Sequence, residues 1–91
     1  MSHAADIPDD DWEKVPEGLH RGIRLWLDDG IVPGSFIRAV ICNNLMDAFA
    51  FADDESRERL SSIVSFFYWS VPSHAWGSDR TFADWRDKEQ E

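Results

Sequence analysis

The sequence has only one cysteine, Cys42, so no disulfide can form within the chain. Small secreted domains usually depend on disulfides, and their absence favours a reducing compartment. Long apolar runs are also missing, since the longest, Ile63 to Tyr68, has six residues and contains Ser65. A membrane-spanning helix needs roughly 20 apolar residues, and the acidic N-terminus lacks the apolar stretch of a signal peptide. We therefore expect a cytoplasmic protein that does not enter a membrane.

Basic residues are scarce as well. Nine Lys and Arg residues stand against 18 Asp and Glu residues, which gives a net charge of −9. Nucleic-acid binding relies on clustered Lys and Arg side chains at the phosphates, so we expect no direct contact with nucleic acid. Over half of the acidic excess lies in residues 1–17, where six acids accompany one lysine. This composition predicts a flexible acidic arm over residues 1–15, a single helical domain over residues 16–87 and a charged tail over residues 88–91.

The apolar residues recur at helical spacing through most of the 91-residue chain. The pattern predicts an all-α fold, a small helical bundle of three main helices plus a short C-terminal helix. The first helix is expected over residues 16–30, where proline suits the start and glycine the end. The second, residues 35–52, is apolar almost all round and is expected to be the central, most buried helix. The third should begin at Asp53 or Asp54 and end before Pro72, and the last should follow Ser78.

Groups that carry catalysis or bind metals are few. The three histidines, His3, His20 and His74, lie far apart in the sequence and show no spacing typical of a zinc site. Cys42 lies within an apolar helical segment without a histidine beside it, where a cysteine behaves as a small apolar residue. We therefore expect no enzyme activity, no metal and no cofactor.

Two carboxamides, Asn43 and Asn44, interrupt the apolar segment of residues 35–52. Asparagine is a poor helix former, and its side chain is costly to bury without a partner. We expect these residues to have a structural role, in which one of them bonds to the backbone of a neighbouring loop. Polar recognition of a ligand or partner is the alternative.

Aromatic residues gather near the C-terminus. The chain has five Trp, six Phe and one Tyr, and seven of these rings lie between Phe66 and Trp85. The four consecutive rings from Phe66 to Trp69 point to all sides of a helix, so one core cannot enclose them all. Coverage by the following loop and helix, an interface with another chain, and ligand stacking are the alternatives. Because Trp and Tyr are favoured interface anchors, the candidate partner-binding residues are Tyr68, Trp69, Trp76 and Trp85.

The arginines offer a second candidate site. Arg21, Arg24 and Arg38 lie in the helical segments beside the aromatic core. Guanidinium groups bind anions through paired hydrogen bonds and stack on aromatic rings, so these three could hold an anionic nucleotide. Ordinary surface ion pairs with nearby aspartates are the alternative.

Several short motifs lie in a fixed order along the chain: Pro33-Gly34-Ser35-Phe36, Ala39-Val40, Asn43, Leu45, Ala52-Asp53, Pro72 and Trp76-Gly77-Ser78. Together they span roughly Leu19 to Trp85 and resemble a family of small phage and prophage proteins of proteobacteria. That family has no assigned activity or catalytic residues, so the resemblance implies a context, the cytoplasm of a host cell, and no residue roles. The chain departs from the family in having Asn43-Asn44 where an Asn-Asp pair is expected.

These observations support one main hypothesis for function and two alternatives. The main hypothesis is a non-enzymatic binding protein of a phage or mobile element, which binds and blocks a host protein, for example part of a defence system, through an aromatic, acid-rimmed surface. The first alternative is a homo-oligomer that binds or sequesters an anionic nucleotide. The second is a self-associating structural accessory protein.

Overall fold

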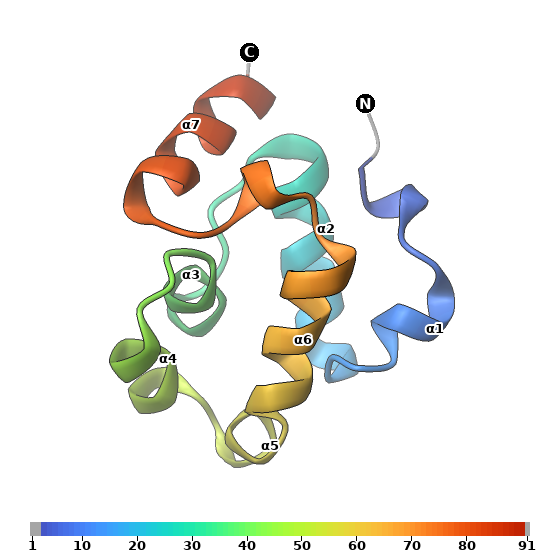
Figure 1. The fold of residues 1–91 in the computed structure, drawn as a ribbon, viewed down its shortest axis with the longest axis vertical. Helices are drawn as coiled ribbons and strands as arrows, with labels where there is room; N and C mark the ends of the chain where they lie inside the picture. The colour runs from blue at the N-terminus through green and yellow to red at the C-terminus, as the bar shows by residue number, and fades with distance from the viewer. Residues whose placement is uncertain (1–2, 91) are drawn as a thin grey trace.

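The structure, a computed structural model, describes residues 3–90, and every regular element in that range is helical (Figure 1). The α-helices are α1 (Asp9–Trp12), α2 (His20–Asp29), α3 (Ser35–Ile41), α4 (Leu45–Phe51), α5 (Asp54–Glu58), α6 (Leu60–Ser70) and α7 (Asp79–Glu89). Three short 3-10 turns are η1 (Ala4–Asp6), η2 (Glu17–Leu19) and η3 (Ser73–Ala75). The predicted all-α class is confirmed. The prediction of three main helices plus a short fourth is wrong, because residues 3–90 form seven α-helices. None of them is long and apolar enough to cross a membrane.

The core is built on α2, α3 and α6, and α3 buries four of its seven residues, among them Ile41. Ile23, Trp26 and Leu27 of α2 are fully buried, as are Ile63 and Phe66 of α6. The expectation that residues 35–52 form one central, most buried helix is wrong in two respects, because the segment is split into α3 and α4 and because α4 is mostly exposed. The first half of that segment, α3, does face the core, whereas α4 buries only Ala48.

The expected second helix is split because Asn43 and Asn44 form a helix stop followed by a helix start. Asn43 has a positive φ of 60°, the left-handed conformation that asparagine tolerates better than most residues. The N–H of Asn44 donates to the carbonyl of Ala39 at 2.8 Å, and the N–H of Asn43 donates to that of Val40 at 3.1 Å. This pair of bonds is the Schellman arrangement that ends a helix. The Asn44 side chain then accepts a bond from the N–H of Asp47 at 3.2 Å, which caps α4.

The expected third helix is also divided, at Arg59, into α5 and α6. Its predicted start is confirmed, because the Asp53 side chain accepts a bond from the N–H of Ser56 at 2.7 Å. Its predicted end is confirmed too, since Val71 turns to an extended conformation before Pro72.

The last helix is longer than expected. Ser78 caps α7 as predicted, accepting a bond from the N–H of Thr81 at 3.1 Å, but α7 runs for 11 residues. Trp85 of α7 is buried against α2, where its Nε1 donates to the carbonyl of Trp26 at 3.0 Å. The expected charged tail of residues 88–91 is helical up to residue 89, and residue 91 lies outside the described residues.

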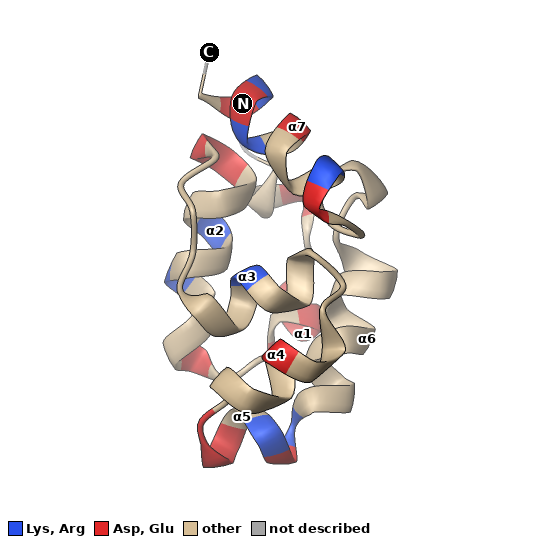
Figure 2. Ribbon diagram, turned by 90° about the vertical axis from the view of Figure 1, so that its left-hand side faces the viewer, with Lys and Arg blue, Asp and Glu red and all other residues tan. Residues whose placement is uncertain are grey.

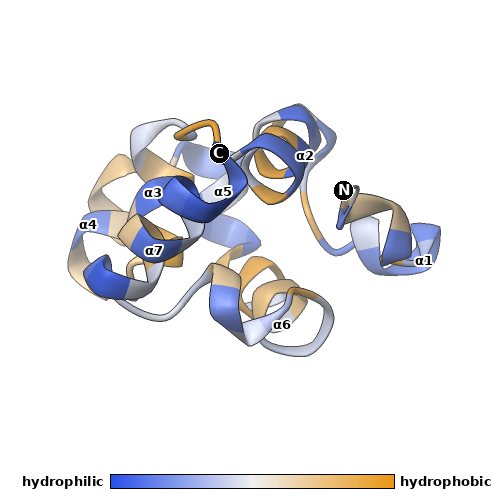
Figure 3. Cartoon of the chain, turned by 90° about the horizontal axis from the view of Figure 1, so that it is seen from above, coloured by the Kyte–Doolittle hydropathy of each residue, from blue (hydrophilic) through white to orange (hydrophobic). Residues whose placement is uncertain are grey.

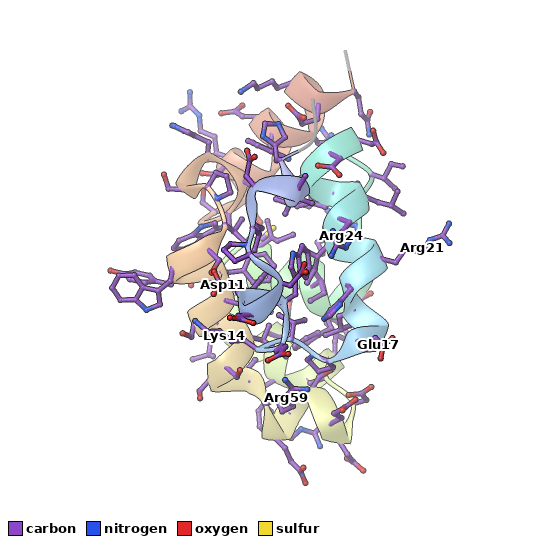
Figure 4. All side chains as sticks on the ribbon, turned by 90° about the vertical axis from the view of Figure 1, so that its right-hand side faces the viewer. Asp11, Lys14, Glu17, Arg21, Arg24 and Arg59 are labelled. Atoms are coloured by element: carbon purple, nitrogen blue, oxygen red, sulfur yellow. The ribbon has the colours of Figure 1, made fainter. Side chains whose placement is uncertain are left out.

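Residues 3–15, expected to belong to a flexible acidic arm, pack along α2 and α6 (Figure 4). Residues 1 and 2 of that expected arm lie outside the described residues. Residues 3–15 pack against the domain because apolar side chains lie between their acidic residues. Four of these apolar side chains join the core: Ala4, Ile7, Trp12 and Val15.

Hydrogen bonds from α6 and the residue before it hold the same segment in place. Arg59 donates to the carbonyl of Glu13 at 2.6 Å. Two serines of α6 add further bonds, Ser62 to the carbonyl of Lys14 at 2.6 Å and Ser70 to the Asp11 carboxylate at 2.9 Å. The acidic segment is therefore tied to the helical domain by both its backbone and its apolar side chains.

Candidate functional site

Large apolar side chains are exposed on two neighbouring helices, α4 and α6. Six of them make up what we call the apolar face: Leu45 (66% exposed), Met46 (78%), Phe49 (53%), Val64 (46%), Tyr68 (61%) and Trp69 (74%). A soluble monomer rarely exposes a contiguous apolar patch of this kind without a use for it, so the apolar face is the first candidate for a functional surface.

A groove lies within this face, between the α3–α4 pair and α6. It has a volume of about 190 Å³. The side chains that line it include Val40, Leu45, Ala48, Val64, Tyr68 and Trp76. Pockets for drug-sized ligands measure about 300–1,000 Å³ and carry a few converging polar groups. The groove is smaller and almost wholly apolar, so it suits a protruding apolar side chain better than a polar small molecule.

The two helices of the face carry little charge, while the Arg57 guanidinium of α5 lies 4.9 Å from the centre of the Phe49 ring. Helix α6 has no charged residue between Leu60 and Ser70, and α4 has one, Asp47. Figure 2 shows the tan ribbon of α6 and the single acidic position on α4, with the other acidic and basic residues on the surrounding elements. Figure 3 shows hydrophobic stretches on both helices from above. Depletion of charge is the compositional mark of the centre of a protein interface.

Two of the four predicted anchors lie on the apolar face. Tyr68 and Trp69 are exposed and contact each other edge to face, with ring centroids 4.7 Å apart. Trp76 is partly buried, lines the groove and donates through Nε1 to the carbonyl of Val71 at 3.2 Å. Trp85 is only 3% exposed and belongs to the core, so it is not part of this surface.

The residues that the sequence analysis missed are those of α4. Leu45, Met46 and Phe49 were expected in a buried helix and instead supply half of the apolar face. The signal that could have found them is the pair Asn43-Asn44. Asparagine is favoured both at the residue after a helix and at the cap before one, so two in a row mark a stop and a restart.

The two asparagines were predicted to have a structural role in which one bonds to a neighbouring loop, and among the described residues the Asn44 side chain instead bonds within its own turn. Neither is buried, and Asn44 bonds to Asp47 through both its oxygen and its Nδ2, which lies 2.8 Å from Oδ2 of Asp47. Both also border the groove. Their bonds serve the turn between α3 and α4, which is the element that presents the apolar face.

The three arginines of the alternative ligand site have separate surroundings. The Arg24 guanidinium lies 4.2 Å from the centre of the Trp12 ring, and that of Arg38 lies 5.0 Å from the Phe82 ring. Arg21 points away from the molecule, as Figure 4 shows. Two of the guanidinium groups thus stack on different rings, one in the N-terminal segment and one in α7, and the three do not converge on a common point.

Cys42 lies beside Arg38 and Asp79 at a second, more polar hollow. Partial burial, together with a hydrogen bond and the negative charge of Asp79, raises the pKa of the Cys42 thiol to about 11. Arg38 acts in the opposite direction and is outweighed. Nucleophilic cysteines have lowered pKa values, so this thiol has the opposite of the property that catalysis requires. Within residues 3–90, no group of three or more His, Cys, Asp or Glu side chains is placed to hold a metal ion.

Comparisons with protein-family models, with curated proteins and with solved structures found no match. The resemblance to phage and prophage proteins therefore stays a prediction from the short sequence motifs.

Proposed function

We propose that this chain is a protein-binding module, which docks another folded protein on the apolar face of α4 and α6. The observation that carries the proposal is the exposure of six large apolar side chains, three of them aromatic, around a groove and on two helices that carry little charge. Each of these features has a cost for an isolated protein in water, and each becomes favourable when a second protein covers the face.

The composition of the face favours a protein over a small ligand. Trp, Tyr, Phe and Met are enriched at the centres of protein interfaces, and the apolar face has one or more of each. The groove offers few polar groups that could orient a small molecule. A nucleotide would also need the converging cations that Arg21, Arg24 and Arg38 do not supply.

Within the face, Tyr68 and Trp69 are the expected energetic centre. They are among its largest side chains, and their contact with each other restricts how much conformational freedom they lose on binding. Truncation of such a ring at the centre of an interface typically costs about 2 kcal/mol or more of binding free energy. Identification of the partner as a host protein, and of the chain as part of a mobile element, rests on the sequence motifs and stays a prediction.

A photo-crosslinking residue in place of Trp69 tests the proposal in the cells that make the protein. We expect irradiation to join position 69 to another protein chain. The same residue in place of Arg21, which is also exposed and lies outside the apolar face, should give little adduct. Absence of any protein adduct at position 69, or equal yields at the two positions, would contradict the proposed binding surface.

A further inference from the structure

We infer that the protein covering the apolar face is a second copy of this chain, in a symmetric dimer. This inference rests on the proposed function, because it identifies the partner of the same surface. Three observations carry it: the exposed area, the distribution of charge, and the position of the protruding rings beside the groove.

The exposed area matches what one subunit of a stable dimer contributes. A fully exposed aromatic side chain presents about 150–250 Å², so the exposed fractions of Phe49, Tyr68 and Trp69 correspond to roughly 300–450 Å². The three aliphatic side chains of the face raise the total to roughly 400–700 Å². A standard interface covers about 800 Å² per partner, and about 65% of a homodimer interface is apolar, which amounts to about 520 Å². The apolar face alone is therefore large enough.

The composition of the face is that of a permanent homodimer rather than of a transient contact. Transient interfaces are about as polar as the rest of the protein surface, whereas obligate dimers resemble a domain core cut in half. The side chains that line the groove include no charged group, and the polar ones among them are those of Asn43, Asn44, Tyr68 and Trp76.

The charge distribution permits self-association of a strongly acidic protein. In a symmetric dimer each face meets its own copy, so a charge near the two-fold axis opposes an identical charge. A chain with a net charge of −9 can pair with itself only through a region from which its acids are excluded. Helix α6 is such a region, with no Asp or Glu over its 11 residues. The one acid on α4, Asp47, is held locally by Asn44 at 2.8 Å.

The face has an exposed ring and a groove next to each other. Trp69 protrudes, and the adjacent residue Tyr68 forms one wall of the groove. In a symmetric contact the Trp69 ring of each copy would enter the groove of the other, so that one type of contact occurs twice. A knob and a hollow next to each other on one face are the arrangement that this symmetry requires.

Sedimentation equilibrium of the purified full chain tests the inference. At micromolar concentration, we expect wild type to have twice the mass of the 10.5 kDa chain. Trp69→Asp on α6 and Met46→Asp on α4 should each raise the dimer dissociation constant about 30-fold or more, the equivalent of losing one central anchor. Both side chains are largely exposed, so the helical circular dichroism of both variants should be unchanged. Ala5→Asp adds the same charge at an exposed position of η1, a turn that contacts α2, and should leave the dimer intact; Figure 1 shows the N-terminal end of the chain beside α2.

The outcomes separate this inference from the proposed function. The inferred dimer is refuted if wild type sediments at its single-chain mass at every concentration. It is also refuted if the dimer survives both Asp substitutions. If wild type is a single chain and position 69 crosslinks to a different protein, the proposed function stands and the dimer is refuted. If wild type is a single chain and position 69 crosslinks to nothing, both are refuted.

Discussion

The Trp12→Ala substitution decides whether the acidic N-terminal segment is part of the folded domain. Trp12 is 3% exposed, and its ring packs 4.9 Å from that of Phe66, with the Arg24 guanidinium on its face. Burial of about 150–250 Å² at about 25 cal/mol per Å² contributes roughly 4–6 kcal/mol to the free energy of unfolding. Within residues 3–90 the buried Nε1 of Trp12 has no hydrogen-bond partner, which offsets about 1–3 kcal/mol. We therefore expect Trp12→Ala to lower the free energy of unfolding by about 3 kcal/mol.

Urea unfolding followed by far-ultraviolet circular dichroism measures this loss, because a domain of this size is expected to unfold in one step. Asp10→Ala is the matched control, since Asp10 lies on the same short helix and is exposed, and its effect should stay within about 0.5 kcal/mol. A free arm, as its composition predicted, would make both substitutions neutral. A loss below about 1 kcal/mol for Trp12→Ala would refute the docked arrangement.

A comparison of tryptophan-to-phenylalanine variants isolates the role of the indole N–H. Trp12→Phe keeps most of the ring and removes a donor without a partner, so it should cost less than about 1 kcal/mol. Trp26→Phe removes the bond from Nε1 to the carbonyl of Ala75 at 3.1 Å and leaves that buried carbonyl unpaired. It should cost about 1–2 kcal/mol more than Trp12→Phe in the same urea assay. Equal losses for the two variants would contradict a stabilising role for the bond from Trp26 Nε1 to the carbonyl of Ala75.

Two further predictions concern the glycines and the cysteine. Gly30→Ala should lower the free energy of unfolding by at least about 1 kcal/mol, and with it the melting temperature. The reason is that Gly30 has a φ of 67° and that a Cβ there would lie 2.9 Å from the carbonyl oxygen of Arg86. Gly22→Ala should have the opposite sign and stabilise by about 0.5–1 kcal/mol, because a Cβ in α2 meets nothing within 4 Å; a destabilised Gly22→Ala would contradict this. The thiol of Cys42 should react with iodoacetamide about 100-fold more slowly at pH 8 than an ordinary thiol, because its pKa is raised from 9.0 to about 11 and only the thiolate reacts. Its rate should rise with pH up to about 11, and Asp79→Asn should lower the pKa and speed the reaction; a rate that levels off near pH 9 would refute the raised pKa.

Features set by local chemistry were predictable from the sequence. Asp53 and Ser78 cap helices as expected, Gly30 ends α2 in a left-handed conformation, and Pro72 follows the end of α6. Each depends on one residue and its nearest neighbours, so the sequence contains the whole cause. The all-α class followed from the same helical periodicity.

Features set by tertiary packing were not predictable in this way. Trp69 and Trp85 are both tryptophans near the end of an aromatic-rich segment, yet one is 74% exposed and the other 3%. The difference arises because α7 folds back onto α2, where Trp85 reaches the carbonyl of Trp26. Nothing within a few residues of either ring specifies that contact. The position of the N-terminal segment was not predictable either. Its composition is acidic overall, whereas its packing depends on a few apolar side chains such as Trp12.

The turn at Asn43 and Asn44 joins the two kinds of feature and creates the candidate site. Ile37, Ile41, Leu45 and Phe49 recur every four residues, so in one unbroken helix they would lie along a single apolar stripe. In the structure the first two are buried and the last two are exposed, because the Schellman turn redirects the chain between them. A surface helix that faced only water would be expected to have polar residues at those outward positions. The retention of large apolar side chains on the outward half of a broken stripe is what a binding surface requires, and it makes the break between α3 and α4 the structural origin of the apolar face.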